Sequence, residues 1–166
     1  HGEGTFTHQD GSTYKGSWFS DKQHGEGTET WPDGTKFIGE YEQGTKNGKG
    51  KFTWSEGSTY EGDFLNNSIH GQGTYTWGDG RIYEGEWRGN QMHGKGNFKW
   101  ADGRMYSGSY ANDLKDGMGK FSWPDGREYD GQWKGGKQHG VGFYTSGTHS
   151  RKKGEWKDGN RTRWLE

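Results

Sequence analysis

Cysteine is absent from the 166-residue chain, and proline occurs only twice. Without cysteine the chain has neither a disulfide framework nor a thiolate metal site. No apolar run approaches the roughly 20 residues that a helix needs to cross a bilayer, and the first residues do not form a signal peptide. Because the sequence starts at His1 rather than Met, we expect it to be a piece of a longer protein.

The large apolar residues Leu, Ile, Val and Phe are also scarce, since together they account for 15 of 166 residues. A fraction this low is typical of disordered chains, but disorder also requires high net charge and few aromatic residues. Here the net charge is −1, and the chain contains 10 Trp, 9 Tyr and 8 Phe. Because aromatic rings bury large areas, the composition predicts an ordered protein with a thin aromatic apolar layer.

Glycine is abundant, with 34 residues, and it marks a repeat of 23 residues. Positions 2, 4 and 16 of every repeat are Gly, and position 18 is always aromatic. Position 8 is Trp in five repeats, positions 10 and 11 are Asp-Gly in five, and position 14 is aromatic in six. Position 1 of the seven repeats is occupied by His1, His24, Asn47, His70, His93, Asp116 and His139.

The glycine and aromatic positions are all even-numbered, apart from the turn glycine at position 11. Successive strand residues point to opposite faces of a sheet, so this pattern predicts half-buried strands with every ring on one face. Asp-Gly between two such stretches predicts a hairpin turn, and positions 19 to 23 are interpreted as a polar link to the next hairpin. Gly on the ring face leaves room for a ring of a neighbouring hairpin to lie flat.

These features predict an all-β fold, an elongated single-layer twisted antiparallel sheet of tandem β-hairpins. A lone hairpin is barely stable, so stability must come from neighbouring hairpins that shield each other's rings. A single-layer sheet also leaves unpaired edge strands, which favour pairing with a second copy.

The sequence resembles the MORN (membrane occupation and recognition nexus) repeat family. Residues 83–87, Tyr-Glu-Gly-Glu-Trp, and residues 93–96, His-Gly-Lys-Gly, match its motif, and the resemblance covers essentially the whole chain. Residues 1–138 are six regular repeats, whereas residues 139–166 form a degenerate C-terminal capping repeat and tail. The chain departs from the motif at Glu29, where a ring is expected, at His8, where Trp is expected, and in the last repeat at Ser146, His149 and Lys152.

Catalytic, metal and nucleotide sites are not expected. The aspartates of the Asp-Gly pairs are interpreted as turn residues, and a strict repeat lacks the dissimilar constellation that an enzyme needs. The histidines at position 1 of adjacent repeats lie about 10 Å apart, too far to share one zinc within a chain, although a site across two chains stays open. Gly-x-Gly without a following helix argues against a nucleotide cofactor, and a pI of about 6.7 argues against nucleic acid.

The ring face is the predicted interaction surface, because a continuous stripe of partly exposed rings exceeds ordinary surface patchiness. The alternative is that the rings only pack on one another. The resemblance implies a groove that holds a peptide or helix of a protein partner, and a homodimer. The predicted groove residues are Trp31, Trp54, Trp77, Trp100, Trp123, Tyr60, Tyr83, Tyr106 and Tyr129.

Six cations near the C-terminus form a second candidate surface, which suits anionic lipids such as phosphoinositides. They are Arg151, Lys152, Lys153, Lys157, Arg161 and Arg163.

The leading hypothesis is a non-enzymatic scaffold, cytoplasmic and associated with the cytoskeleton or peripherally with a membrane, which self-associates and binds a protein partner. The alternatives are a membrane-tethering module that binds anionic phospholipids, and a regulatory region of a larger enzyme such as a lipid kinase.

Overall fold

The computed structural model describes residues 1–147 and 150–165, which form fifteen strands and no helix. The described part of the chain therefore contains no helix that would be long and apolar enough to cross a membrane. The strands are β1 (Gly2–Thr7), β2 (Thr13–Phe19), β3 (Lys22–Thr30), β4 (Lys36–Glu42), β5 (Thr45–Thr53), β6 (Thr59–Leu65), β7 (Ser68–Thr76), β8 (Ile82–Arg88), β9 (Gln91–Lys99), β10 (Met105–Ala111), β11 (Leu114–Ser122), β12 (Glu128–Lys134), β13 (Lys137–Thr145), β14 (Arg151–Lys157) and β15 (Asn160–Trp164).

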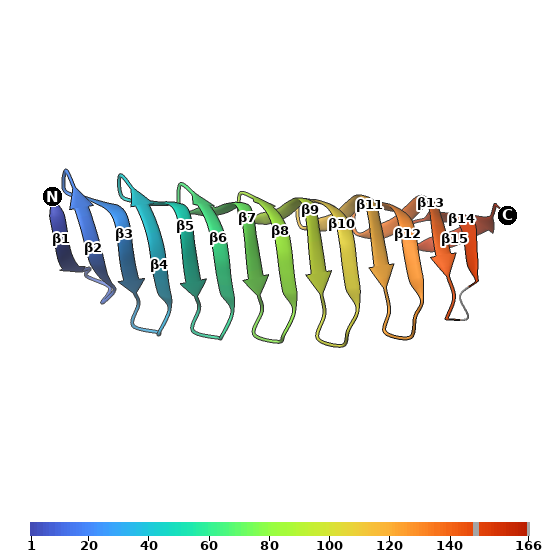
Figure 1. Cartoon of the computed structure of the whole chain (residues 1–166), viewed down its shortest axis with the longest axis horizontal. Helices are drawn as coiled ribbons and strands as arrows, with labels where there is room; N and C mark the ends of the chain where they lie inside the picture. Colours follow the sequence, from blue (N-terminus) through green and yellow to red (C-terminus); the bar gives the residue numbers. More distant parts are fainter. Residues whose placement is uncertain (148–149, 166) are drawn as a thin grey trace. The chain divides into compact units, whose positions relative to one another are not determined.

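The strands are neighbours in chain order within one open antiparallel sheet (Figure 1). This arrangement confirms the predicted all-β array of tandem hairpins. The chain divides into two compact units, which are described separately: the first contains residues 1–78 and 87–90, and the second contains residues 79–86 and 91–166.

The Asp-Gly turns connect one strand to the next through five residues, as between Thr30 of β3 and Lys36 of β4. In the turn after β3, the Gly34 N–H donates to the Trp31 carbonyl (3.0 Å), and the Trp31 N–H donates to the Thr35 carbonyl (2.9 Å). Gly34 has a φ of +95°, and the Asp33 carboxylate accepts the Thr35 N–H (2.9 Å). This is a type I turn followed by a left-handed residue, for which Pro, Asp and Gly at these places are well suited.

The predicted polar link at positions 19 to 23 is wrong, because these residues form a second, tighter hairpin. Between β6 and β7, Leu65 pairs directly with Ser68, and the two turn residues Asn66 and Asn67 have φ values of 47° and 71°. Two consecutive positive φ values define a type I′ turn, which Asn and Gly tolerate. Neighbouring turns are also joined, since the Asn67 N–H donates to the Lys46 carbonyl (3.0 Å) and the Lys46 N–H donates to the Asn67 side chain (2.8 Å).

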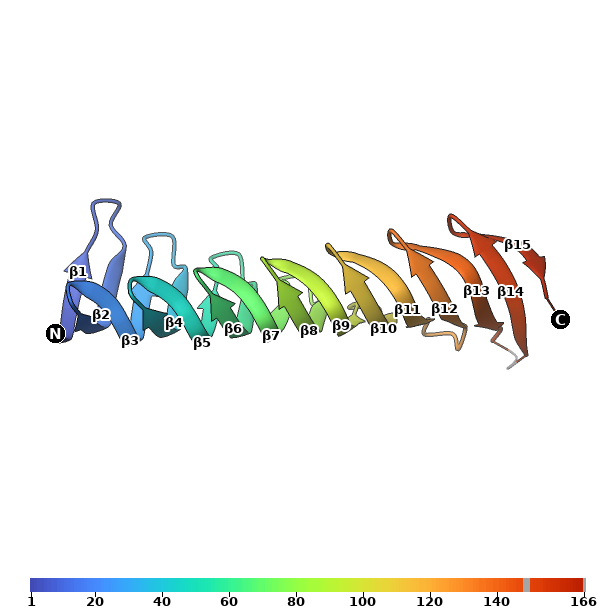
Figure 2. The same ribbon diagram turned by 90° about the horizontal axis from the view of Figure 1, so that it is seen from above.

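A β-bulge follows the position-16 glycine of most repeats. At the bulge of repeat 2 the side chain at position 17 accepts a backbone hydrogen bond. Opposite Glu40, the position-2 glycine Gly48 has a φ of +106°, and the pairing of β4 with β5 shifts register between Gly39 and Tyr41. The Lys49 N–H donates to the Glu40 carboxylate (2.8 Å). The Glu40 carboxylate therefore replaces a lost ladder hydrogen bond. The strands are visibly curved in Figure 2.

Replacing Glu40 by Ala should lower the free energy of unfolding by about 1 kcal/mol, because the Lys49 N–H then loses its protein acceptor. Urea denaturation followed by tryptophan fluorescence measures the change. Ser109→Ala is the matched control, since Ser109 occupies the same position and its hydroxyl is not needed as an acceptor at the bulge; we expect a change within about 0.5 kcal/mol. Equal losses in the two variants would contradict the role given to Glu40.

Candidate functional site, the ring face

The core of each unit is an inner row of rings contributed by positions 14 and 18. Neighbouring rings meet nearly perpendicular, as in the contacts of Tyr60 with Phe64 (5.2 Å between centroids, 90°) and with Trp87 (5.7 Å, 88°). The second unit repeats this arrangement in the contacts of Tyr106 with Tyr110 and with Trp133. Edge-to-face contacts of this kind add to the stabilisation from burial.

Each position-14 ring lies on a glycine of the following repeat, as the sequence predicts. A Cβ built on Gly73 would stand 2.1 Å from the Tyr60 hydroxyl and 2.4 Å from its ring. The Tyr60 hydroxyl donates to the Asp63 carbonyl (2.9 Å), and burial raises the pKa of this phenol well above its usual value. Glycine is therefore required here by the close approach of the ring, not by an unusual backbone angle.

The four tyrosines predicted to line the partner-binding groove lie in this inner row. Their exposed fractions are between 0% and 1%, so their side chains are covered and do not reach a partner. The prediction placed them on the correct face of the sheet but expected them to be accessible. That face carries two rows of rings, and these tyrosines belong to the covered inner row. The residues concerned are Tyr60, Tyr83, Tyr106 and Tyr129.

An outer row of rings, from positions 6 and 8, lies on the same face and stays partly exposed at every position-8 Trp. In the first unit Trp31 stacks on Phe52 (5.6 Å, 22°), and Phe52 stacks on Trp54 (4.6 Å, 18°). In the second unit Trp100 contacts Phe98 (4.3 Å) and Phe121 (5.3 Å). We call this set the outer ring row; its tryptophans are Trp31, Trp54 and Trp77 in the first unit and Trp100 and Trp123 in the second.

The side chain at position 23 lies between the two rows, a placement that the sequence did not suggest. In repeat 2 the Lys46 ammonium lies 5.2 to 5.9 Å from the centroids of four rings. It also pairs with Glu29 (3.5 Å), which accepts a hydrogen bond from the Tyr41 hydroxyl (2.6 Å). Glu29, which departs from the repeat motif, therefore neutralises a lysine in the ring face.

Lys115 is the equivalent residue of repeat 5, and its ammonium lies 5.4 to 5.7 Å from four rings, those of Trp100, Tyr106, Phe121 and Trp133. The position that holds Glu29 in repeat 2 holds Phe98 in repeat 5. Within the described residues no carboxylate lies within 4.0 Å of the Lys115 ammonium. Burial lowers the pKa of Lys115, and the nearby charge of Arg104 lowers it further.

Position 12 is Arg in repeats 4 to 6 but not in the first three repeats. Arg104 lies over the Trp100 ring (5.2 Å), and its Nε donates to both carboxylate oxygens of Asp102 (3.1 and 2.8 Å). Arg127 and Asp125 repeat this arrangement at Trp123 (5.1 Å). In the first three repeats position 12 is instead a buried hydroxyl residue, Ser12, Thr35 or Ser58. Hydrogen bonds from the turn backbone lower the pKa of Asp102 and Asp125, which agrees with their predicted role as turn residues.

Two position-1 histidines accept hydrogen bonds from the tight turns. The Gln43 N–H donates to His24 Nδ1 (3.5 Å), and the Gly89 N–H donates to His70 Nδ1 (3.3 Å). In the described ranges, 1–147 and 150–165, no three His, Asp or Glu side chains are grouped in a way that suits a metal ion. His149, one of the departures in the last repeat, lies outside these ranges.

The six C-terminal cations are divided between the two faces of β14 and β15. Arg161 (4.2 Å) and Lys152 (5.4 Å) lie over the Trp164 ring, on the face of Trp156. Arg163 pairs with Glu155 through two contacts of 3.0 Å on the opposite face. Strand alternation places Arg151, Lys153 and Lys157 on that same opposite face, so the six residues do not form one patch.

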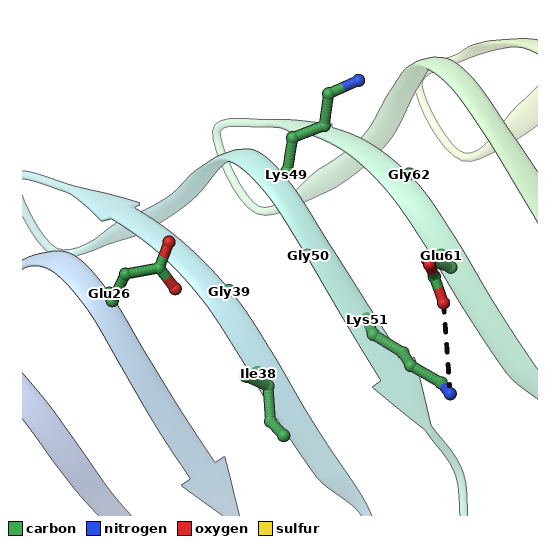
Figure 3. Close-up of a pocket in the computed structure, with 8 residues that line it drawn as sticks. All are labelled: Glu26, Ile38, Gly39, Lys49, Gly50, Lys51, Glu61 and Gly62. Atoms are coloured by element: carbon green, nitrogen blue, oxygen red, sulfur yellow. Dashed lines mark ion pairs between the residues drawn. The ribbon is translucent and has the colours of Figure 1, made fainter.

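A hollow of about 550 Å³ lies in the first unit, on the face opposite the rings (Figure 3). Gly39, Gly50 and Gly62 form part of its lining, together with Glu26, Ile38, Lys49, Lys51 and Glu61. Its charges are largely paired within the protein, since Lys51 contacts Glu61 (4.0 Å) and Lys49 contacts Asp63 (2.5 Å). The hollow therefore offers no concentration of one charge to a ligand.

Comparison with known families shows a match to the MORN repeat model over most of the chain. The matched stretches are residues 1–13, 14–36, 37–59, 60–80, 83–103, 106–126 and 129–151. No curated protein sequence matches significantly.

Two solved structures are among those that resemble this chain. The TCP10 domain of CPAP from Danio rerio, in complex with a peptide of STIL, is 18% identical over 91% of this chain and 68% of that chain, with a TM-score of 0.47. The TCP domain of SAS-4 (dCPAP) from Drosophila melanogaster, in complex with a proline-rich motif of Ana2, is 11% identical over 93% of this chain and 90% of that chain, with a TM-score of 0.44. Likeness at this level does not bear on function.

Proposed function

Since the chain belongs to the MORN repeat family, we propose that it is a non-enzymatic scaffold whose outer ring row holds a peptide or helix of a protein partner. The observation that supports this proposal is the partly exposed stack of Trp and Phe or Tyr rings in each unit. The buried parts of these tryptophans contribute to the stability of the fold, whereas their exposed parts offer a rigid apolar surface to a partner. Tryptophans of this kind dominate the binding energy of many protein interfaces.

The alternative, that the rings serve packing alone, is weaker for the outer row than for the inner row. The position-14 and position-18 rings of the core are covered to 7% exposure or less, and so are Phe98 and Phe121 of the outer row, whereas every position-8 Trp stays partly exposed. Partly exposed tryptophans at position 8 recur in five repeats.

Selection of displayed random 12-residue peptides on the wild-type chain tests the proposal. Selected peptides should bind at least tenfold more weakly to either Trp31→Ala/Trp54→Ala or Trp100→Ala/Trp123→Ala, because each lost tryptophan contact removes more than about 1 kcal/mol. Leu65→Ala is the matched control, since Leu65 is 45% exposed but lies outside the outer ring row, and its affinity should stay within twofold. Failure to select any peptide, or wild-type affinity in both double variants, would contradict the proposal.

Self-association through an edge strand, location in a cytoskeletal or membrane-associated assembly, and binding of anionic lipids stay predictions. The division of the six C-terminal cations between two faces gives lipid binding no specific support, so it is not advanced as a second function.

A further inference from the structure

We propose that Lys115 recognises an acidic side chain, Asp or Glu, of the peptide that binds to the outer ring row of the second unit. This inference rests on the proposed function and adds the chemistry of the partner. It begins from the ammonium of Lys115, which four rings surround and which no carboxylate of the described residues neutralises.

Repeat 2 provides an internal comparison, because it holds a lysine at the same position. There the protein itself supplies the anion, and the side chains of Lys46 and Glu29 are only 14% and 12% exposed. In repeat 5 the rings are kept and the glutamate is replaced by Phe98. The site around Lys115 therefore has the cation and the rings of repeat 2 but lacks its carboxylate.

The charged groups nearest to Lys115 do not provide that carboxylate. Arg104 adds a positive charge, and both oxygens of Asp102 are already engaged by the Arg104 Nε. Asp116, the next residue along the chain, accepts the N–H of Gly135 (3.3 Å) at the tight turn. Charge complementarity therefore favours an anionic partner at this point of the ring face.

The rings explain why the cation is tolerated without an anion and why an anion would still add affinity. Ring faces attract an ammonium and offset part of its desolvation. A carboxylate that joins the ammonium in these surroundings forms a charge-assisted hydrogen bond, which is about twice as strong as a neutral one. Repeats 1, 3, 4 and 6 place uncharged side chains at this position, Gln23, Ile69, Met92 and Gln138, and would not make this contact.

The test compares peptides selected on the wild-type chain with those selected on Lys115→Met, which introduces the residue that repeat 4 uses at the same position. Wild-type peptides that depend on Trp100 and Trp123 should share an acidic residue at one place. Changing that residue to Asn or Gln should weaken binding about tenfold on the wild-type chain and less than twofold on Lys115→Met. Glu29→Phe/Lys46→Met, which changes the equivalent site of repeat 2, should behave like the wild type.

The possible results separate this inference from the proposed function. Peptides that depend on Trp100 and Trp123 but lack a shared acidic residue, or whose acidic residue matters equally in Lys115→Met, would overturn the role of Lys115 and leave the proposed function standing. Failure to select any peptide would overturn both. Near-ultraviolet circular dichroism checks the fold of the variant, and Lys115→Gln, which copies repeats 1 and 6, replaces it if Lys115→Met does not fold.

Discussion

Replacing Gly73 by Ala is expected to lower the free energy of unfolding by about 3 kcal/mol, a large effect for the addition of one methyl group. The new Cβ would stand 2.1 Å from the Tyr60 hydroxyl. That ring is held by the hydrogen bond to the Asp63 carbonyl and by perpendicular contacts with Phe64 and Trp87, so it cannot move aside without losing them. Chemical denaturation of the purified protein measures the loss.

The matched control is Gly4→Ala, which adds the same methyl group at the same position of the first repeat. There the Cβ meets only Trp18, at 3.0 Å from Nε1 and 3.2 Å from Cδ1, so we expect a loss below about 1 kcal/mol. Tyr60→Ala alone should cost about 3 to 5 kcal/mol. Combined with Gly73→Ala, it should cost less than the sum of the single changes, because the methyl group then fills vacated space. Additive losses would show that the ring and the glycine are independent.

Replacing Glu29 by Gln is expected to lower the free energy of unfolding by about 3 kcal/mol at neutral pH. The amide keeps an acceptor for the Tyr41 hydroxyl, so the change isolates the loss of the charge beside Lys46. Removing one partner of a pair that is shielded from water leaves an uncompensated charge, which costs more than the pair itself contributes. Thermal and urea denaturation at fixed pH give the difference.

The double variant Glu29→Phe/Lys46→Met shows whether the charge pair or the packing matters. It introduces an aromatic ring at position 6 and an uncharged side chain at position 23, which is the combination found in repeat 4. We expect its stability to lie within about 1 kcal/mol of the wild type or above it, because apolar replacements of buried pairs are often neutral or stabilising. A loss as large as that of Glu29→Gln would refute this interpretation.

Much of the fold could be predicted because the repeat obeys simple alternation over most of its length. Even-numbered positions fall on one face along β4 and β5, where Phe37 pairs with Phe52 and Gly39 pairs with Gly50. The same alternation could not predict which rings of that face are buried and which stay partly exposed. Tyr60 and Trp54 occupy the same face, but only Tyr60 lies on a glycine of the following hairpin and is covered by rings of the inner row.

The charged residues of the ring face were missed because alternation is interrupted twice in most repeats, by the tight turn and by the bulge. Lys46 occupies an odd position, but the two-residue turn places it opposite Tyr41 and thus on the ring face. The bulge at Glu40 and Gly48 then restores the alternation for the rest of β5. A count along the sequence that ignores both interruptions assigns Lys46 and Lys115 to the face opposite the rings.

Because each position-14 ring lies on a glycine of the next repeat, the array has a direction. One side of a regular repeat presents a ring, and the other side presents the glycine that receives a ring. Gain or loss of complete 23-residue repeats keeps every position-14 ring next to a glycine that receives it. Loss of the single strand that follows a position-14 ring removes the glycine on which that ring lies. In the last repeat Lys152 replaces the position-14 ring. This repeat can therefore receive a ring from the preceding repeat but does not present one of its own. We therefore expect such an array to tolerate the duplication or deletion of complete repeats better than that of single strands.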